Sequence, residues 1–401
     1  MPAEPSGTPA PLDVAALRAE TPGCAHRVHL NNAGAALPTR RTLDTVVDHL
    51  HLESEIGGYE AAAARAEERS AVRTSAAHLL GASEDEVALT TSDTSAWTKA
   101  LWGFVLGGGL DRRRRVVVDH AVYNSHYLSV LQLAAHRGVE VEVVPAGPDG
   151  TLDLDRMEQA LAAPTALLSV THVPTSSGLV NPVARVGELA RVAEVPFFLD
   201  ACQSVGQLPV DVRAIGCDVA TSTGRKWLRA PRGTGLLFVR RGFAERLDPP
   251  GIDATSAEWT TDDGYRLAPG ARRADEFEAS VAAQLGLGAA IDQLLELGVE
   301  RISTRIGELA DHLRRRLDGL SGVATADGSG PRSGIVTFAV EGHDADEVSS
   351  RAASSGINLS VSRAEDARLD LGVRGLAAVV RASPHAFNTT DELDQLVDLL
   401  A

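Results

Sequence analysis

The sequence contains very little lysine. Lysine and arginine together number 38 in 401 residues, yet only Lys99 and Lys226 are lysines. Arginine keeps its proton in proteins and cannot form an imine, whereas a lysine amine can become a nucleophile. Imine chemistry on a side chain is therefore confined to two positions. A helix surface accounts for Lys99, but Lys226 lies in a glycine-rich turn between two apolar runs, where a reactive amine and an ordinary loop lysine are both conceivable.

Cysteine, long apolar runs and positive charge are also scarce. The three cysteines, Cys24, Cys202 and Cys217, are too scattered for a disulfide framework and favour a reducing cytoplasm. No apolar run approaches the roughly 20 residues that span a bilayer, so we expect no membrane segment. A net charge of −16 argues against nucleic-acid binding. The histidines lack zinc-site spacing, so no metal site is expected.

Strand and helix signals alternate between residues 87 and 239, and this alternation predicts an α/β fold with a mostly parallel sheet. Ligands should then bind beyond the carboxyl ends of its strands. We expect a disordered leader and an N-terminal helix over residues 1–27, a large domain over 28–278 and a small α+β domain over 279–401. The Pro-, Gly-, Asp- and Thr-rich stretch 248–273 is expected to be a long excursion that lines a distal pocket with the turn at 57–59.

Several chemically useful residues fall at the ends of the predicted strands. The hydroxyl-rich segment 90–95 enters a helix, where backbone N–H groups favour a phosphate, although a plain N-cap explains it equally well. Asp200 follows an apolar strand and needs a cationic partner, either a pyridinium nitrogen or an arginine. Tyr123 offers a flat ring. The nearby histidines, His126 among them, have the ordinary structural explanation.

Together these groups match the requirements of pyridoxal 5′-phosphate. The lysine would hold the aldehyde and move the Cα proton, and the acid would keep the ring nitrogen protonated. The aromatic side chain would clamp the ring, and the hydroxyls would seat the phosphate.

The chain resembles the class V aminotransferase group of fold-type I pyridoxal-phosphate enzymes, which includes cysteine desulfurases, selenocysteine lyases and isopenicillin N epimerase. The resemblance runs from about Leu30 to the C-terminus and is carried by the segments 169–173, 200–203, 223–226 and 380–383. It implies a large domain with a seven-stranded sheet in an α/β/α sandwich, a small C-terminal α+β domain, and a homodimer that completes each site across its interface.

The resemblance also assigns roles to individual residues. Arg381 would bind the substrate carboxylate, with Asn32 and Tyr59 also at the substrate. Arg225 stands where desulfurases commonly have histidine. Lys226 and Asp200 would be catalytic. The implied cofactor-binding residues are Thr94, Ser95, Tyr123, Thr175, Asp200, Gln203, Thr223, Arg225 and Lys226, with Ser280 reaching the phosphate from the neighbouring subunit.

Within the group, the segments 30–36, 56–59 and 224–229 look closest to the C–S lyases of ergothioneine biosynthesis and to related lyases of cysteine S-conjugates in natural-product pathways. Desulfurases carry a nucleophilic cysteine shortly before the carboxylate-binding arginine, and residues 354–380 contain none. We therefore expect β-elimination from a cysteine S-conjugate or its sulfoxide, giving a thiol or sulfenate, pyruvate and ammonia. Alternatives are an aminotransferase, an epimerase, a decarboxylation-coupled deaminase, or a binding protein without turnover.

Overall fold

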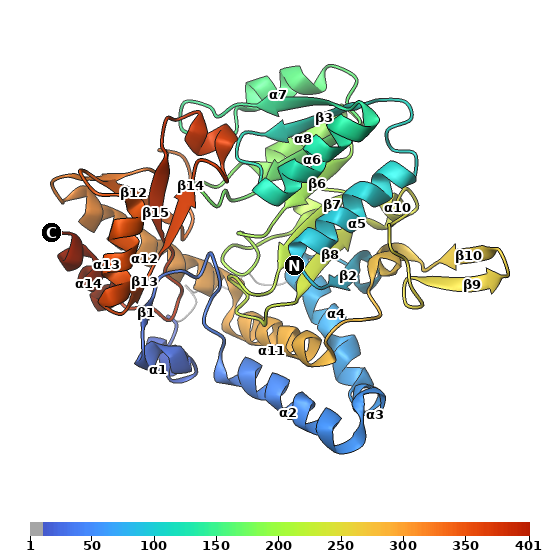
Figure 1. Ribbon diagram of the computed structural model, residues 1–401, viewed down its shortest axis with the longest axis horizontal. Helices are drawn as coiled ribbons and strands as arrows, with labels where there is room; N and C mark the ends of the chain where they lie inside the picture. Colours follow the sequence, from blue (N-terminus) through green and yellow to red (C-terminus); the bar gives the residue numbers. More distant parts are fainter. Residues whose placement is uncertain (1–10) are drawn as a thin grey trace, which may run out of the picture.

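A seven-stranded sheet forms the centre of the protein (Figure 1), with the strand order β2-β8-β7-β6-β5-β3-β4. The computed structural model describes residues 11–401, so the predicted disordered leader falls almost entirely outside the described residues. All neighbouring strands are parallel except β8, which is antiparallel to β2 and β7. The predicted mostly parallel sheet is confirmed. Its strands are β2 (Val87–Thr90), β3 (Arg115–Asp119), β4 (Glu140–Val144), β5 (Leu167–Thr171), β6 (Phe197–Asp200), β7 (Val219–Thr223) and β8 (Gly235–Val239).

Helices cover both faces of this sheet because its strands are apolar on both sides. Successive strand residues enter different cores: Val117 packs into one buried cluster, whereas Val116 and Val118 pack into another. The first cluster includes residues of α4 (Ala66–Leu80), α7 (Leu154–Leu161), α8 (Val183–Val192) and α11 (Val281–Leu297). The second includes residues of α5 (Asp93–Leu106), α6 (Asn124–Arg137) and α10 (Arg241–Ala244). The result is the expected α/β/α sandwich.

A second, four-stranded antiparallel sheet lies beside the sandwich (Figure 1), in the order β11-β12-β15-β14. Its strands are β11 (Val323–Thr325), β12 (Val336–Val340), β14 (Ser360–Arg363) and β15 (Ala378–Ala382), and its helices are α12 (Val299–Asp318), α13 (Ala345–Ser354) and α14 (Thr390–Leu400). The N-terminal strand β1 (Val28–His29) joins this part by pairing in parallel with β13 (Ile357–Asn358). The predicted domain boundary at 278/279 precedes α11, yet α11 packs in the sandwich. The boundary therefore stays a prediction.

Two segments differ from the expected loops. The turn predicted at 57–59 is a single-residue break: Gly57 has φ of 101° between α2 (Arg40–Ile56) and α3 (Gly58–Ala64). The excursion over 248–273 contains an antiparallel hairpin, β9 (Ala257–Thr261) and β10 (Gly264–Leu267), that projects from the sandwich (Figure 1). Its polar composition concealed the strands because the hairpin has no core-facing stripe.

The remaining short helices are α1 (Val14–Ala19), η1 (Pro22–Ala25), η2 (Glu84–Glu86), α9 (Val212–Ile215), η3 (Gly270–Ala274) and the π-type turn η4 (Arg368–Gly372). Among residues 11–401, no helix has both the length and the apolarity that crossing a membrane requires.

Candidate functional site

A cavity of about 240 Å³ lies where several strands of the large sheet end. The segments that follow β2, β3, β6 and β7 meet there, as expected for carboxyl ends of parallel strands. Its lining residues are Thr91, Ser92, Asp93, Thr94, Tyr123, Cys202, Thr223, Arg225, Lys226, Arg232 and Gly233. Five of the residues predicted for cofactor binding, Thr94, Tyr123, Thr223, Arg225 and Lys226, are therefore brought together.

The loop that carries Lys226 is held tightly by its own backbone. The Ala230 N–H donates to the Gly224 carbonyl at 2.9 Å, and the Arg229 N–H donates to the Lys226 carbonyl at 2.9 Å. A Cβ atom on Gly224 would lie 2.2 Å from Thr234 Oγ1, so only glycine fits at that position. The Lys226 side chain is buried, and its Nζ lies 5.6 Å from the centroid of the Tyr123 ring.

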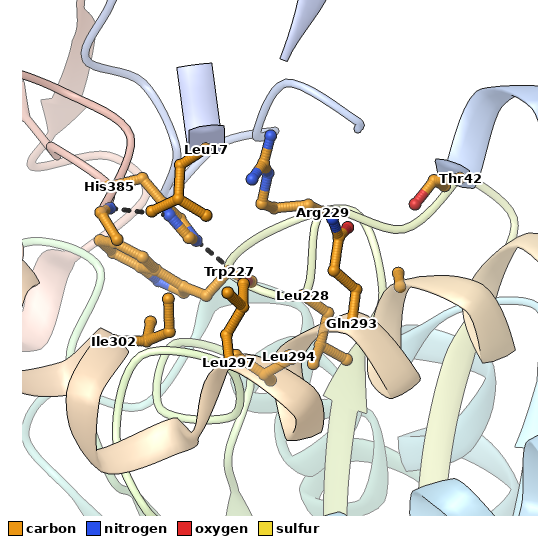
Figure 2. Close-up of a pocket in the computed structure, with 12 residues that line it drawn as sticks. Leu17, Thr42, Trp227, Leu228, Arg229, Gln293, Leu294, Leu297, Ile302 and His385 are labelled. Carbon is orange, nitrogen blue, oxygen red and sulfur yellow. Dashed lines mark hydrogen bonds between the residues drawn. The ribbon is translucent and has the colours of Figure 1, made fainter. Parts of the chain in front are cut away.

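The residues after Lys226 are anchored to both parts of the protein (Figure 2). Figure 2 shows Trp227 between His385, from the segment before α14, and Ile302 of α12. The His385 ring bonds the Trp227 carbonyl through Nε2 at 3.1 Å, and the Trp227 indole N–H donates to Gln203 Oε1 at 2.9 Å. Arg229 donates to Thr21 Oγ1 at 2.6 Å. The position of the lysine is thus fixed by contacts with distant segments.

The N-terminal end of α5 forms one end of the cavity. Ser92 caps this helix, since its Oγ accepts from the Ser95 N–H at 3.0 Å. Arg225 reaches the same cavity, and its Nη1 is buried without a hydrogen-bond partner. Helix N–H groups and an unpaired guanidinium nitrogen together suit a phosphate. The Ser95 hydroxyl, in contrast, donates to Glu276 beside a neighbouring hollow, so the structure turns it away from the predicted role.

Asp200 lies at the end of β6 beside His126, a buried histidine to which the sequence assigned only a structural explanation. Its Oδ1 accepts from the Cys202 N–H at 2.9 Å, and its Oδ2 lies 3.6 Å from Nδ1 of His126. The other ring nitrogen of His126, Nε2, bonds Asp93 Oδ2 at 2.8 Å. Since His126 follows Tyr123 by three residues at the start of α6, helical spacing was the one signal that could have placed it at the site.

Burial and neighbouring charges shift the pKa values of Asp200 and Asp93 in opposite directions. Burial raises the pKa of Asp200, and the charge of Asp93 adds to this effect, while His126 opposes it. Burial alone would also raise the pKa of Asp93, but the contact with His126 outweighs it and holds that pKa well below its usual range. Asp200 is thus a buried acid in need of a further cationic partner.

Arg381 approaches the site from β15 in the small sheet. Its Nη1 donates to Thr175 Oγ1 at 2.6 Å and to the Thr175 carbonyl at 3.2 Å, and its Nη2 donates to Asn31 Oδ1 at 3.3 Å. Its Nε is buried without a partner. Burial lowers the pKa of Arg381 to about 10, which leaves the guanidinium charged at neutral pH. Gln203 Nε2 also donates to Thr175 Oγ1, at 3.2 Å.

Three predicted residues lie elsewhere in this single chain. Asn32 is fully buried and its Nδ2 donates to the carbonyls of His29 and Ser383, so its neighbour Asn31 contacts Arg381 instead. Tyr59, which is 80% exposed, and Ser280, the N-cap of α11, line a different cavity of about 910 Å³. A contribution of these two residues to the site of a partner subunit stays a prediction.

Comparison with known proteins supplies the family. The family described as aminotransferase class-V matches residues 28–396. A probable hercynylcysteine sulfoxide lyase of Mycobacterium tuberculosis is 32% identical over 93% of this chain and 89% of its own length. A probable cysteine desulfurase of Methanothermobacter thermautotrophicus is 28% identical over 96% of each chain.

Solved structures share the fold. The apo cysteine desulfurase of Thermococcus onnurineus superposes with a TM-score of 0.89 at 23% identity, over 96% of each chain. The cystine C–S lyase C-DES, solved with its product cysteine persulfide, has a TM-score of 0.84 at 20% identity over 95% of this chain and 98% of its own. The resemblance drawn from the sequence motifs is confirmed: the chain belongs to the aminotransferase class-V family.

Proposed function

We propose that the protein is a pyridoxal-phosphate-dependent carbon–sulfur lyase that cleaves the Cβ–S bond of a cysteine S-conjugate or its sulfoxide. Its membership of the aminotransferase class-V family supports the cofactor, as does a structural neighbour solved with glycine covalently linked to its pyridoxal-phosphate cofactor. The similarity to the probable sulfoxide lyase supports the reaction. Ergothioneine or another sulfur-containing natural product is the biosynthetic setting we propose.

The residues around the cavity fit the cofactor. Arg225 lines the cavity, and its Nη1 is buried without a hydrogen-bond partner, which is costly unless another group satisfies it. Thr94 and the first N–H groups of α5 would hold the phosphate together with Arg225. Tyr123 would stack on the ring, and Asp200 would pair with its protonated nitrogen. Bound there, the cofactor supplies an electron sink for the pair left when a Cα–H bond breaks.

The chain's own groups account for the remaining steps. Arg381 presents a buried, unpaired Nε and the adjacent Nη2, the edge that binds a carboxylate in two parallel hydrogen bonds. Lys226 Nζ would take the Cα proton and hold it. The sulfur then leaves Cβ with the bonding electron pair as a thiolate or sulfenate, and one water molecule completes the conversion of the remaining fragment to pyruvate and ammonia.

The thiols of this chain argue for elimination over persulfide relay. Residues 354–380, which lead to Arg381, contain no cysteine. Burial raises the pKa of Cys24, Cys202 and Cys217, so none is readily the thiolate that attacks sulfur. This absence of an activated thiol near Arg381 is the observation that carries the proposal. The unpaired state of all three cysteines also supports the proposed cytoplasmic location.

We also propose that the protein is a homodimer. Tyr59 and Phe277 are 80% and 50% exposed beside the 910 Å³ cavity, and large exposed aromatic side chains favour an interface. A second subunit covering this face would bury them and would bring Ser280 and Tyr59 toward another cavity. Light scattering on purified protein tests the dimer directly, and a monomer at micromolar concentration would contradict it.

The reaction is tested by incubating the cofactor-loaded protein with a panel of cysteine S-conjugates and their sulfoxides. Pyruvate and ammonia released in equal amounts, with a thiol or sulfenate, support the lyase. Alanine formed from cysteine would indicate a desulfurase. An oxo acid with retained sulfur would indicate an aminotransferase, an inverted substrate an epimerase, and released carbon dioxide a decarboxylating deaminase. The Lys226→Ala variant is the control for turnover at this site.

A further inference from the structure

A buried line of charged groups, Asp93, His126 and Asp200, extends from the start of α5 to the end of β6. Both nitrogens of the His126 ring face carboxylates: Nε2 lies 2.8 Å from Asp93 and Nδ1 lies 3.6 Å from Asp200. The side chain of His126 is 0% exposed, and those of Asp93 and Asp200 are 7% and 4% exposed. Water therefore screens none of these charges well.

The surroundings of the ring favour its charged form. The indole of Trp97, one turn after Asp93 on α5, stacks on the imidazole with ring centroids 4.1 Å apart and planes 10° apart. A cation against an indole face is stabilised by the ring quadrupole. Tyr123 meets the imidazole edge-on at 5.8 Å. A neutral imidazole has one donor and one acceptor nitrogen, so it would place a lone pair against one of the two carboxylates.

We infer that His126 is a positioning residue that stays doubly protonated between Asp93 and Asp200, and thereby keeps Asp200 ionised for the pyridine nitrogen of the cofactor. Asp93 holds the proton on His126 from one side. His126 in turn lowers the cost of burying a negative charge on Asp200. Asp93 lines the same cavity, and through His126 it decides the protonation of the acid that contacts the cofactor. The inference rests on the proposed cofactor, and not on which substrate is cleaved.

Three charged groups and one phenol surround the ring. Asp93 faces it from α5, Asp200 from β6 and Lys226 from the loop after β7, and Tyr123, the N-cap of α6, meets it edge-on. Burial lowers the pKa of His126 and Lys226 does so too, but the two carboxylates outweigh them and raise it above 6.5. A raised histidine pKa stabilises the folded state fully below about pH 6.5, and this stabilisation is lost as pH rises through the folded pKa.

The lowered pKa of Asp93 has the opposite sign. Its stabilising effect is present above the ordinary aspartate pKa of 3.8 and is lost as pH falls through the folded value. Asp93 and His126 therefore both carry their charges at pH values between the lowered pKa of Asp93 and the raised pKa of His126. Asp93→Asn keeps the shape and an acceptor oxygen for Nε2 but removes the charge, so His126 should lose its second proton near neutral pH.

The test compares wild-type holoenzyme, labelled with ¹⁵N-histidine, with two variants. His126→Gln assigns the ring N–H signals by their loss, and Asp93→Asn removes the carboxylate. Asp394→Asn is the matched control, because Asp394 accepts from His312 at 2.8 Å in a similar Asp–His pair between α12 and α14. The measurements are the ring N–H resonances, the pH dependence of the visible absorbance of the bound cofactor, and the cofactor dissociation constant.

Wild-type His126 should show two ring N–H signals from about pH 5 to 8, the range in which an ordinary histidine loses its proton. Asp93→Asn should lose one of them within that range. Asp200 should then hold the pyridinium proton less firmly, and weakening that positive charge should shift the absorbance profile to higher pH. The weaker Asp200–pyridinium bond should lower cofactor affinity roughly 10- to 100-fold. Asp394→Asn should match wild type in all three measurements.

A single ring N–H on His126 in wild-type holoenzyme at neutral pH overturns the inference. So does an Asp93→Asn variant with unchanged absorbance profile and cofactor affinity, or one whose His126 keeps both protons. If His126→Gln does not fold, the wild-type and Asp93→Asn spectra still decide. None of these readouts uses turnover, so a failure to release pyruvate from any S-conjugate would reject the lyase reaction and leave this inference standing.

Discussion

Arg381 offers the sharpest test of the substrate-binding geometry. One side of its guanidinium is already used, since Nη1 donates twice to Thr175. The other edge, Nε with Nη2, carries one long bond of 3.3 Å to Asn31 and is otherwise unpaired. That edge is the only part of the group that can receive a carboxylate in two parallel bonds. Arg381→Lys keeps the charge but can supply neither the fork nor both sets of contacts.

The expected magnitude follows from the number of bonds lost. A hydrogen bond to a charged group contributes about 1.5–3 kcal/mol, so losing one of two carboxylate bonds should lower kcat/KM about 10- to 100-fold. Arg381→Leu loses both bonds and leaves Thr175 Oγ1 with Gln203 as its remaining partner, so a fall of about 100- to 10,000-fold is expected. Because the carboxylate is bound equally before and during bond cleavage, most of the change should appear in KM.

The assay is pyruvate release against the best S-conjugate found by screening, with kcat and KM measured separately. Arg363→Lys is the matched control, because Arg363 lies on the neighbouring strand β14 and holds Asp346 with two bonds of 2.8 and 2.6 Å at the surface. It should leave both constants within about twofold, since exposed ion pairs contribute little. If Arg381→Lys changes KM by less than about threefold, Arg381 does not bind the substrate carboxylate.

Three further predictions concern the lysine loop and the buried core. Lys226→Ala should lose the visible absorbance of the bound cofactor and all turnover while keeping its circular dichroism; retained absorbance would place the covalent link elsewhere. Gly224→Ala should displace the lysine loop and weaken cofactor retention, whereas Gly307→Ala in α12, where no atom lies within 4 Å of the added Cβ, should raise the free energy of unfolding by about 0.5–1 kcal/mol. Equal effects of the two alanines would contradict this reasoning. Arg314→Met should lower the free energy of unfolding by about 3–5 kcal/mol in chemical denaturation, because it leaves Asp327, 2.9 Å away and 1% exposed, without its cation; a loss under about 1 kcal/mol would show that the pair is not a structural requirement.

Local sequence was sufficient to predict those elements whose burial leaves an apolar pattern along the chain. The apolar runs at 116–118 and 235–239 lie within the predicted alternation of strands and helices, and both are buried in strands of the central sheet. The helix α6 falls within the same alternation and ends before Gly138, which adopts the left-handed conformation. The hairpin over 257–267 escaped prediction because its exposed side chains, Trp259 at 80% among them, reflect no core-facing period.

The candidate site likewise has features that the sequence predicted and features that only the structure shows. Chain position alone marked Lys226, Asp200 and Tyr123, because each follows a strand of a parallel sheet and the carboxyl ends of such strands meet. It could not decide side-chain direction. Asn31, and not Asn32, contacts Arg381, because the chain turns at Asn32 and the Asn32 amide donates to the carbonyls of His29 and Ser383.

What the sequence by itself determined is the set of chemical groups: two lysines, one of them in a glycine-rich turn, an acid after an apolar strand, and no cysteine within residues 354–380. The tertiary structure alone decided the environment of those groups. It placed His126 between two carboxylates from different elements and turned the Ser95 hydroxyl to Glu276. Such pairings depend on how α5, α6 and β6 pack, which no local pattern encodes, because they join residues far apart along the chain.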